Sequence, residues 1–255
     1  MKNSYKKRLI VSSITTLLLA GVAAPALAAP VKNIVLVHGA FVGGSGWRPV
    51  YDILTKDGYN VTLVQEPLTS FTDDVTATKR ILDEQKGPAI LVGHSYGGAI
   101  ITEAGNDSHV AGLVYIAAHA LDAGETEASN GKKFPNSARP FAKSAVGYLT
   151  IKPENFPSDF AADLPLKEAE FEAHAQMPTN ASVFTANIPD PAWKVKPSWY
   201  MVAQQDKIIN PDLERMYAAR AHSHKVEIAG ASHSVYESHP KEVAALIEQA
   251  AQHAL

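Results

Sequence analysis

The chain has 255 residues, of which 46% are hydrophobic and 19% charged, a balance typical of a globular protein rather than a disordered or fibrous one. Its formal net charge of −3 at pH 7 gives it no electrostatic reason to bind nucleic acid, so we expect no such partner. It contains no cysteine, which excludes disulfides, thiolate metal sites and cysteine nucleophiles together.

The first 28 residues have the pattern of a cleavable signal peptide. Four basic residues precede a largely apolar run over 9–24, and Ala26-Leu27-Ala28 has the small-x-small pattern of a cleavage site. Polar residues interrupt the run and Pro25 follows it, which favours a signal peptide over a membrane-spanning helix. We therefore predict an exported protein, periplasmic or secreted, with no stable membrane anchor after cleavage. The remaining residues, 29–255, are enough for one domain with one substantial core.

Strands and helices alternate along the first part of this predicted mature chain. Continuous apolar runs indicate buried strands, and apolar residues at helical spacing indicate helices. In chain order we predict a strand over 33–39, a helix over 47–56, a strand over 61–65, a helix over 73–86, a strand over 89–93, a helix over 97–105 and a strand over 110–117. This alternation predicts an α/β fold with a doubly wound, mostly parallel sheet.

The alternation stops between about 119 and 193. Prolines, charges and short helical stretches such as 166–174 replace the buried strands there, so we interpret the segment as a small inserted helical cap. A strand over 198–203, a helix over 212–221, a strand over 225–229 and a helix over 240–252 then resume the pattern. Ligands bind at the carboxyl ends of the strands in a doubly wound sheet, so residues directly after each strand are the candidates for function.

One such position carries the sequence Gly93-His94-Ser95-Tyr96-Gly97, between an apolar strand and a helix. A sharp turn from strand to helix strains the backbone of its central residue, and it needs small residues two positions away on either side. Gly93 and Gly97 meet that need and leave the hydroxyl of Ser95 exposed at the tip. This pattern predicts that Ser95 is a nucleophile.

A serine hydroxyl needs a base to accept its proton and a third group to orient that base. Asp206 follows the predicted strand over 198–203, and His233 follows the strand over 225–229. We therefore predict His233 as the base and Asp206 as the acid. Asp122, beyond the strand that ends at 117, is an alternative acid, and His38 and His94 are alternatives for the base.

These segments resemble the α/β-hydrolase superfamily, because Ser, Asp and His occur in the order which that fold uses. The segments are His38-Gly39-Ala40-Phe41 with Trp47, Gly93-His94-Ser95-Tyr96-Gly97-Gly98, Asp206, and Gly230-Ala231-Ser232-His233. Within the superfamily the chain is most similar to the branch that holds small bacterial esterases, plant methyl-ester esterases and hydroxynitrile lyases. The resemblance covers nearly all of 29–255, the cap least.

The resemblance also implies an oxyanion hole, the pair of backbone N–H groups that bind the negative oxygen of the reacting carbonyl. One donor would be Tyr96, directly after the nucleophile. The other would be Ala40, with Phe41 as the alternative. By position, Trp47 and His119 are candidates for the wall of a substrate pocket, although core and hinge roles are open for both.

The activity that follows is hydrolysis of a small-molecule carboxylic ester through an acyl-enzyme, with no cofactor and no metal site. Thioester, lactone and amide substrates stay open, as do the acyl and alcohol groups and the oligomeric state. A hydroxynitrile lyase is one alternative, but those lyases carry a lysine directly after the catalytic histidine, where this chain has Ser234. A small-molecule binding protein without activity is the other alternative.

Overall fold

The computed structural model describes residue 1 and residues 29–255. The predicted signal peptide therefore lies almost wholly outside the described residues. Within the described part of the chain, no helix combines the length and apolar character needed to cross a membrane.

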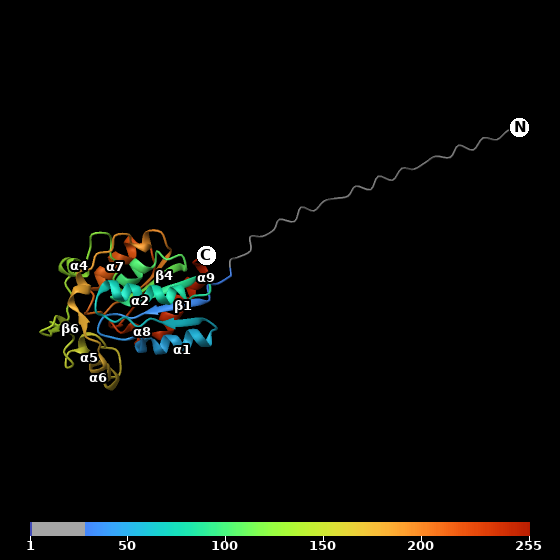
Figure 1. Cartoon of the computed structure of the whole chain (residues 1–255). Helices are drawn as coiled ribbons and strands as arrows, with labels where there is room; N and C mark the ends of the chain where they lie inside the picture. Colours follow the sequence, from blue (N-terminus) through green and yellow to red (C-terminus); the bar gives the residue numbers. More distant parts are fainter. Residues whose placement is uncertain (2–28) are drawn as a thin grey trace.

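A six-stranded parallel sheet forms the centre of the molecule (Figure 1). Its order is β2-β1-β3-β4-β8-β9, and every neighbouring pair runs parallel. The strands are β1 (Asn33–Val37), β2 (Asn60–Leu63), β3 (Ala89–Ser95), β4 (Val110–Ala118), β8 (Ser198–Ala203) and β9 (His224–Ile228). The predicted fold class, a doubly wound parallel α/β sheet, is confirmed.

Helices cover both faces of this sheet, and the alternation of side chains along β1 shows how the faces divide. Val35 and Val37 pack in one core cluster, together with residues of α2 (Phe71–Asp83), α3 (Gly97–Ala104) and α7 (Pro211–Arg220). Ile34 and Leu36 pack in a second cluster, with residues of α1 (Arg48–Lys56), α8 (Val235–Ser238) and α9 (Pro240–His253). All five residues of β1 are buried, as expected of a strand covered on both sides.

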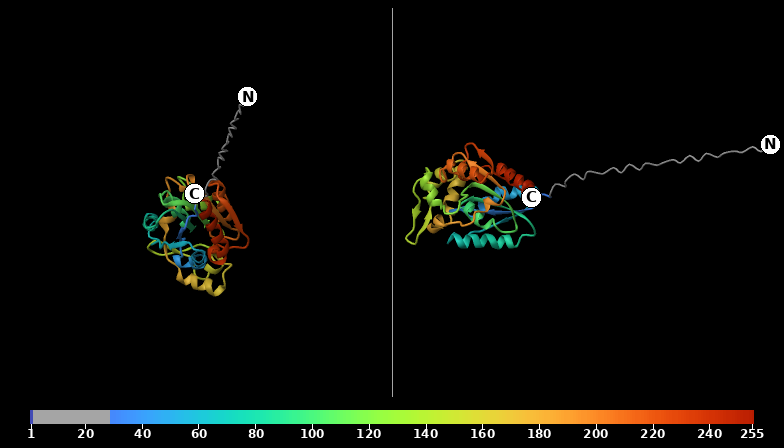
Figure 2. Two further views of the ribbon diagram at one scale, coloured as in Figure 1. Left: turned by 90° about the vertical axis from the view of Figure 1, so that its right-hand side faces the viewer. Right: turned by 90° about the horizontal axis from the view of Figure 1, so that it is seen from above.

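Most of the segment between β4 and β8 gathers at one end of the sheet, opposite the end where β1 begins and α9 ends (Figures 1 and 2). Since the strands are parallel, this is the end where their carboxyl termini lie. The segment contains α4 (Glu127–Lys133), α5 (Phe156–Asp159), α6 (Leu166–Ala175) and a three-stranded antiparallel sheet of β5 (Ala142–Lys143), β6 (Tyr148–Thr150) and β7 (Thr179–Asn180). It also contains two short 3₁₀ helices, η2 (Ala181–Thr185) and η3 (Ala192–Lys194). We did not predict the small sheet, because strands of two or three residues leave no periodicity in the sequence.

Most predicted elements are present with ends that shift by one to three residues, and two helix starts show why. The helix expected over 73–86 is α2, Phe71–Asp83, and begins earlier because Ser70 caps it. The Ser70 side chain accepts a hydrogen bond from the Asp73 N–H, one of the N–H groups that a helix start leaves without a partner. The loop after β1 holds another 3₁₀ helix, η1 (Gly44–Trp47), so α1 starts at Arg48 rather than at Trp47.

Candidate active site

Ser95 is the last residue of β3, and α3 begins two residues later. Its backbone has a φ of +54°, in the left-handed region that non-glycine residues rarely adopt. A Cβ on Gly93 would lie 2.5 Å from the backbone oxygen of Gly97, and a Cβ on Gly97 would lie 2.6 Å from that of His38. The turn is therefore closed to larger residues at both glycine positions, for the steric reason that the sequence pattern suggested.

A chain of hydrogen bonds links Ser95 to two residues far away in the sequence. The Oγ of Ser95 lies 2.8 Å from Nε2 of His233, and Nδ1 of His233 lies 2.5 Å from Oδ2 of Asp206. The other oxygen of Asp206 accepts the N–H groups of Ile208 and Ile209, at 2.7 and 2.9 Å. Because both Asp206 oxygens are engaged, the carboxylate is fixed in the orientation that holds the imidazole.

His94 packs against His233 and bonds to its backbone. Its Nε2–H donates to the backbone carbonyl of His233 at 2.9 Å, and the two rings pack 4.7 Å apart. Burial, and next the proximity of His233, hold the pKa of His94 well below its ordinary value, so the ring is neutral. The neutral, fully buried ring of His94 is thus bonded to the backbone of His233, whereas Oγ of Ser95 lies beside Nε2 of His233.

Glu214 of α7 lies next to Asp206 and was not among the residues we predicted. It is fully buried, and its Oε2 accepts the Ala203 N–H at 3.1 Å. Burial, and next the charge of Asp206, raise its pKa well above the ordinary value, so the side chain is uncharged. The signal in the sequence was its spacing, because Leu213, Glu214, Tyr217 and Ala218 all lie on the buried face of α7.

The loop after β1 brings Ala40 and Phe41 to the same cavity as Ser95. The Phe41 N–H is already engaged, donating to Oγ1 of Thr179 at 3.0 Å, and Phe41 has a φ of +69°. Within residues 29–255, the N–H groups of Ala40 and Tyr96 form no hydrogen bond. The geometry therefore favours Ala40 over Phe41 as the second N–H donor beside Ser95.

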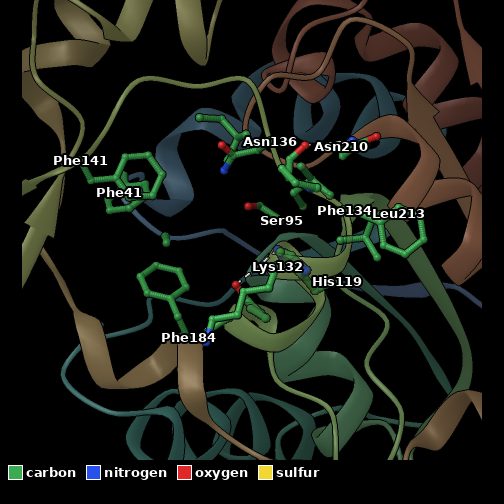
Figure 3. Close-up of a pocket in the computed structure, with 17 residues that line it drawn as sticks. Phe41, Ser95, His119, Lys132, Phe134, Asn136, Phe141, Phe184, Asn210 and Leu213 are labelled. Carbon is green, nitrogen blue, oxygen red and sulfur yellow. Dashed lines mark hydrogen bonds and ion pairs between the residues drawn. The ribbon is translucent and has the colours of Figure 1, made fainter.

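The cavity has a volume of about 420 Å³ and is lined mainly by apolar side chains. Figure 3 shows Phe41, Phe141 and Phe184 on one side of Ser95, and Phe134 and Leu213 on the other. The lining comes from the loop after β1, from α4 and the segment that follows it, and from the loop between β8 and α7. The sheet thus provides the serine, while the segment between β4 and β8 provides much of the wall.

His119 lines this cavity, in the position where we expected a pocket residue. The backbone N–H of His119 donates to the backbone carbonyl of Ser95 at 3.1 Å, so His119 is adjacent to the serine where β3 and β4 end. Its Nε2 lies 3.3 Å from Oε2 of Glu127, a residue that sequence reasoning missed. Burial, and next His233, lower the pKa of His119 to about 3, while burial raises that of Glu127 to about 8. At neutral pH this buried pair is uncharged.

Trp47 does not line the cavity, which corrects its candidacy as a pocket residue. It is fully buried in the second core cluster and packs against the rings of Tyr236 and His94. The physical reason is its place in η1, which leads directly into α1 on the face of the sheet away from the cavity. Trp47 thus supports His94 from the core.

The alternative candidates for the base and the acid contact other residues. Asp122 forms an ion pair with Lys194 at 2.5 Å rather than contacting His233. His38 is buried, with its Nδ1–H donating to the Gly39 carbonyl and its Nε2 2.6 Å from the Glu66 carboxylate. Burial lowers the pKa of His38, but Glu66 outweighs that effect and the net shift is upward.

Among the described residues, one group of potential metal ligands comes together: Asp83, Asp107 and His109. None of the three lines the cavity. Nδ1 of His109 is already 2.9 Å from Oδ1 of Asp107, and all three side chains are partly or fully exposed. The arrangement is that of a solvated surface cluster.

Comparison with known proteins adds both a family and a fold. A family model described as the alpha/beta hydrolase family matches residues 34–246. A carbendazim hydrolyzing esterase of Nocardioides sp. (strain SG-4G) is 34% identical over 108 residues, which are 37% of this chain and 45% of that protein. The chain thus matches less than half the length of this curated relative.

Several solved structures are similar over most of the chain, at identities that show the fold alone. Polyneuridine aldehyde esterase has a TM-score of 0.71 at 18% identity, over 86% of this chain and 98% of that one. A pyrethroid hydrolase from Sphingobium faniae JZ-2 has a TM-score of 0.72 at 23% identity, over 88% and 98%. Tomato methylketone synthase I has a TM-score of 0.74 at 16% identity, over 88% and 99%.

Proposed function

The chain belongs to the alpha/beta hydrolase family, and on that premise we propose that it hydrolyses a carboxylic ester of a small molecule through an acyl-enzyme formed on Ser95. The observation that carries the proposal is the hydrogen-bonded chain Ser95–His233–Asp206 at the wall of a largely apolar cavity. The carbendazim hydrolyzing esterase that resembles part of the chain supports ester hydrolysis as the reaction class.

In the proposed mechanism, Ser95 Oγ attacks the carbonyl carbon while His233 Nε2 accepts its proton. Asp206 holds the ring through Nδ1 and stabilises the imidazolium that forms. The N–H groups of Ala40 and Tyr96 bind the negative oxygen of the tetrahedral intermediate, each worth about 3 to 4 kcal/mol of the barrier.

His233 then returns the proton to the departing alkoxide, and the C–O bond of the ester breaks. A water molecule, deprotonated by the same nitrogen, attacks the acyl-enzyme; the bond from the acyl carbon to Ser95 Oγ then breaks, His233 returns the proton to Oγ, and the acid is released. The substrate and one water molecule are the only groups outside the chain that the two steps need. We further propose that the segment over about 119–193 acts as a cap, since its residues supply much of the wall of the cavity that the substrate must enter.

Labelling and hydrolysis together test this proposal. Wild-type protein should react with a fluorophosphonate probe and hydrolyse p-nitrophenyl acetate, and Ser95→Ala should lose the label and reduce kcat by about 10⁴-fold or more. Ser45→Ala, which alters an exposed serine in η1, is the matched control and should keep both signals. A wild-type protein that neither labels nor hydrolyses the ester would contradict the proposal.

Export is a separate proposal, supported by the sequence pattern of residues 1–28 alone. Expression of the full chain in a bacterial host, followed by mass measurement of the exported protein, should give a chain that begins at Ala29. Recovery of the uncut chain in the cytoplasm would overturn it.

A further inference from the structure

Glu127 is the feature of the cavity that the proposed mechanism leaves unused. It is the first residue of α4, where Thr126 and Ser129 form a capping box that fixes the start of the helix. Its side chain lines the cavity that contains Ser95 but is only 7% exposed. Its Oε1 is buried and has no hydrogen-bond partner among the described residues. A buried carboxyl group left this way needs a countercharge or a proton.

The surrounding residues do not supply a countercharge. His119, whose Nε2 lies 3.3 Å from Oε2 of Glu127, is itself uncharged, and this contact is long for a hydrogen bond. Arg220 is engaged by Glu125, with its two terminal nitrogens 2.8 and 2.9 Å from the carboxylate oxygens. Lys132, on the same helix and also lining the cavity, forms no ion pair with Glu127 in the described structure.

Glu127 is therefore a neutral carboxylic acid at pH 7, because burial raises its pKa to about 8. A neutral acid has one O–H hydrogen to donate, and in an apolar site that donor has few competitors. The same cavity is lined by the rings of Phe41, Phe134, Phe141 and Phe184 (Figure 3), and these rings suit apolar groups of a substrate. A substrate that left this O–H without an acceptor would bind less tightly, because a buried donor without a hydrogen bond costs free energy.

We propose that Glu127 and His119 form a polar subsite that binds an uncharged hydrogen-bond acceptor, an ether or second carbonyl oxygen, on an otherwise apolar ester. The inference rests on the proposed function, which places the scissile carbonyl at Ser95. The backbone N–H of His119 donates to the backbone of Ser95, so His119 is next to the serine. The acceptor oxygen of the substrate should therefore lie only a few bonds from the scissile carbonyl. The subsite selects among substrates and takes no part in bond breaking.

Pairs of esters that differ by one oxygen test the subsite. On the acyl side the pair is p-nitrophenyl 3-methoxypropanoate and p-nitrophenyl pentanoate, and on the alcohol side it is 2-methoxyethyl acetate and butyl acetate. For each pair we measure kcat/KM for the ether ester divided by kcat/KM for the alkyl ester. A variant that is damaged in general loses activity on both esters alike, so this ratio does not change.

In one of the pairs we expect Glu127→Leu to lower this ratio about tenfold, the effect of one buried hydrogen bond. Glu127→Gln keeps an N–H donor without a titrating group, so it should hold the ratio within about threefold of wild type. Glu242→Gln, an exposed glutamate of α9, is the matched control and should leave the ratio unchanged.

Three results would overturn the inference. The first is an equal ratio in wild type and Glu127→Leu for both pairs. The second is a loss in Glu127→Gln as large as in Glu127→Leu. The third is a wild-type preference for p-nitrophenyl 4-(trimethylammonio)butanoate over its uncharged isostere, the 5,5-dimethylhexanoate, that Glu127→Gln removes, because that preference would make the subsite a cation site.

Failure of the proposed function gives a different result, since wild type would then hydrolyse none of these esters. In that event, calorimetric binding of the uncleaved ether and alkyl esters to wild type and Glu127→Leu tests the subsite alone. Tighter binding of the ether in wild type and its loss in the variant would support the subsite, and equal binding would refute it.

Discussion

Thr179 connects the segment between β4 and β8 to the loop that carries Ala40, and its replacement by valine tests that connection. Its side chain is fully buried, and its Oγ1 accepts the Phe41 N–H at 3.0 Å. The Phe41 carbonyl in turn accepts the Met177 N–H at 2.9 Å. These two bonds hold Phe41 in its left-handed conformation, with a φ of +69°. Valine has nearly the same shape as threonine but no acceptor.

Two effects follow from Thr179→Val. The Phe41 N–H loses its partner in a buried site, which costs about 1 to 3 kcal/mol of stability. The strained backbone of Phe41 also loses one of its two restraints, so the adjacent Ala40 N–H should move from its position beside Ser95. Since the loss of one oxyanion donor costs about 10²- to 10³-fold in kcat, a displaced donor should cost at least about tenfold and no more than that range.

The assay is kcat for p-nitrophenyl acetate together with urea unfolding of the same preparations. Thr179→Ser keeps the hydroxyl and is the control, so it should retain kcat within about threefold. If Thr179→Val loses stability as expected while kcat is unchanged, the hydrogen bond serves only folding. That result would refute our placement of the Ala40 N–H in the oxyanion hole by way of this loop.

Three further predictions concern other parts of the site. Asp206→Asn should lower kcat by about 10⁴-fold with little change in fold, measured on p-nitrophenyl acetate, because the amide favours the wrong tautomer of the histidine; retention of full activity would exclude Asp206 as the orienting acid. Gly93→Ala should abolish soluble expression or unfold at much lower temperature, since its Cβ would lie 2.5 Å from the Gly97 oxygen, whereas Gly131→Ala, where a Cβ meets nothing within 4 Å, should be as stable as wild type by thermal melting. The raised pKa of Glu127, about 8, means that the folded protein keeps this proton while the unfolded chain loses it, so the stability it contributes is complete below about pH 4.5 and declines as pH rises to 8. The free energy of unfolding of wild type relative to Glu127→Gln should fall over that interval, by at most about 5 kcal/mol, and a difference independent of pH would show that Glu127 is ionised in the folded state.

The main elements of the fold were predictable because their signals are local. A strand buried on both faces needs a run of apolar residues, and β1, β3, β4 and β8 each contain such a run. The turn around Ser95 was visible for a similar reason, since the steric demand on Gly93 and Gly97 is met within five residues. The chain order of Ser95, Asp206 and His233 then followed from the position of each after a strand.

Residues whose roles depend on packing between distant segments could not be found this way. Thr179 is 138 residues from Phe41, and nothing in the sequence around either residue pairs them. Trp47 was a candidate for the pocket because of its place near the loop after β1. In the structure η1 continues directly into α1, and this places the Trp47 side chain in the second core cluster. The choice between Ala40 and Phe41 likewise needed the partner of the Phe41 N–H.

The sequence by itself determined the parallel α/β fold and the residues that come to the carboxyl edge of the sheet, because strand burial and turn sterics act over a few neighbouring residues. Only the tertiary structure decided how Ser95, His233 and Asp206 meet, which N–H groups are free, and what lines the cavity. Burial of Glu127 and Glu214 was also beyond the sequence, since the charge state of a carboxyl group depends on the solvent and partners that the complete fold leaves to it.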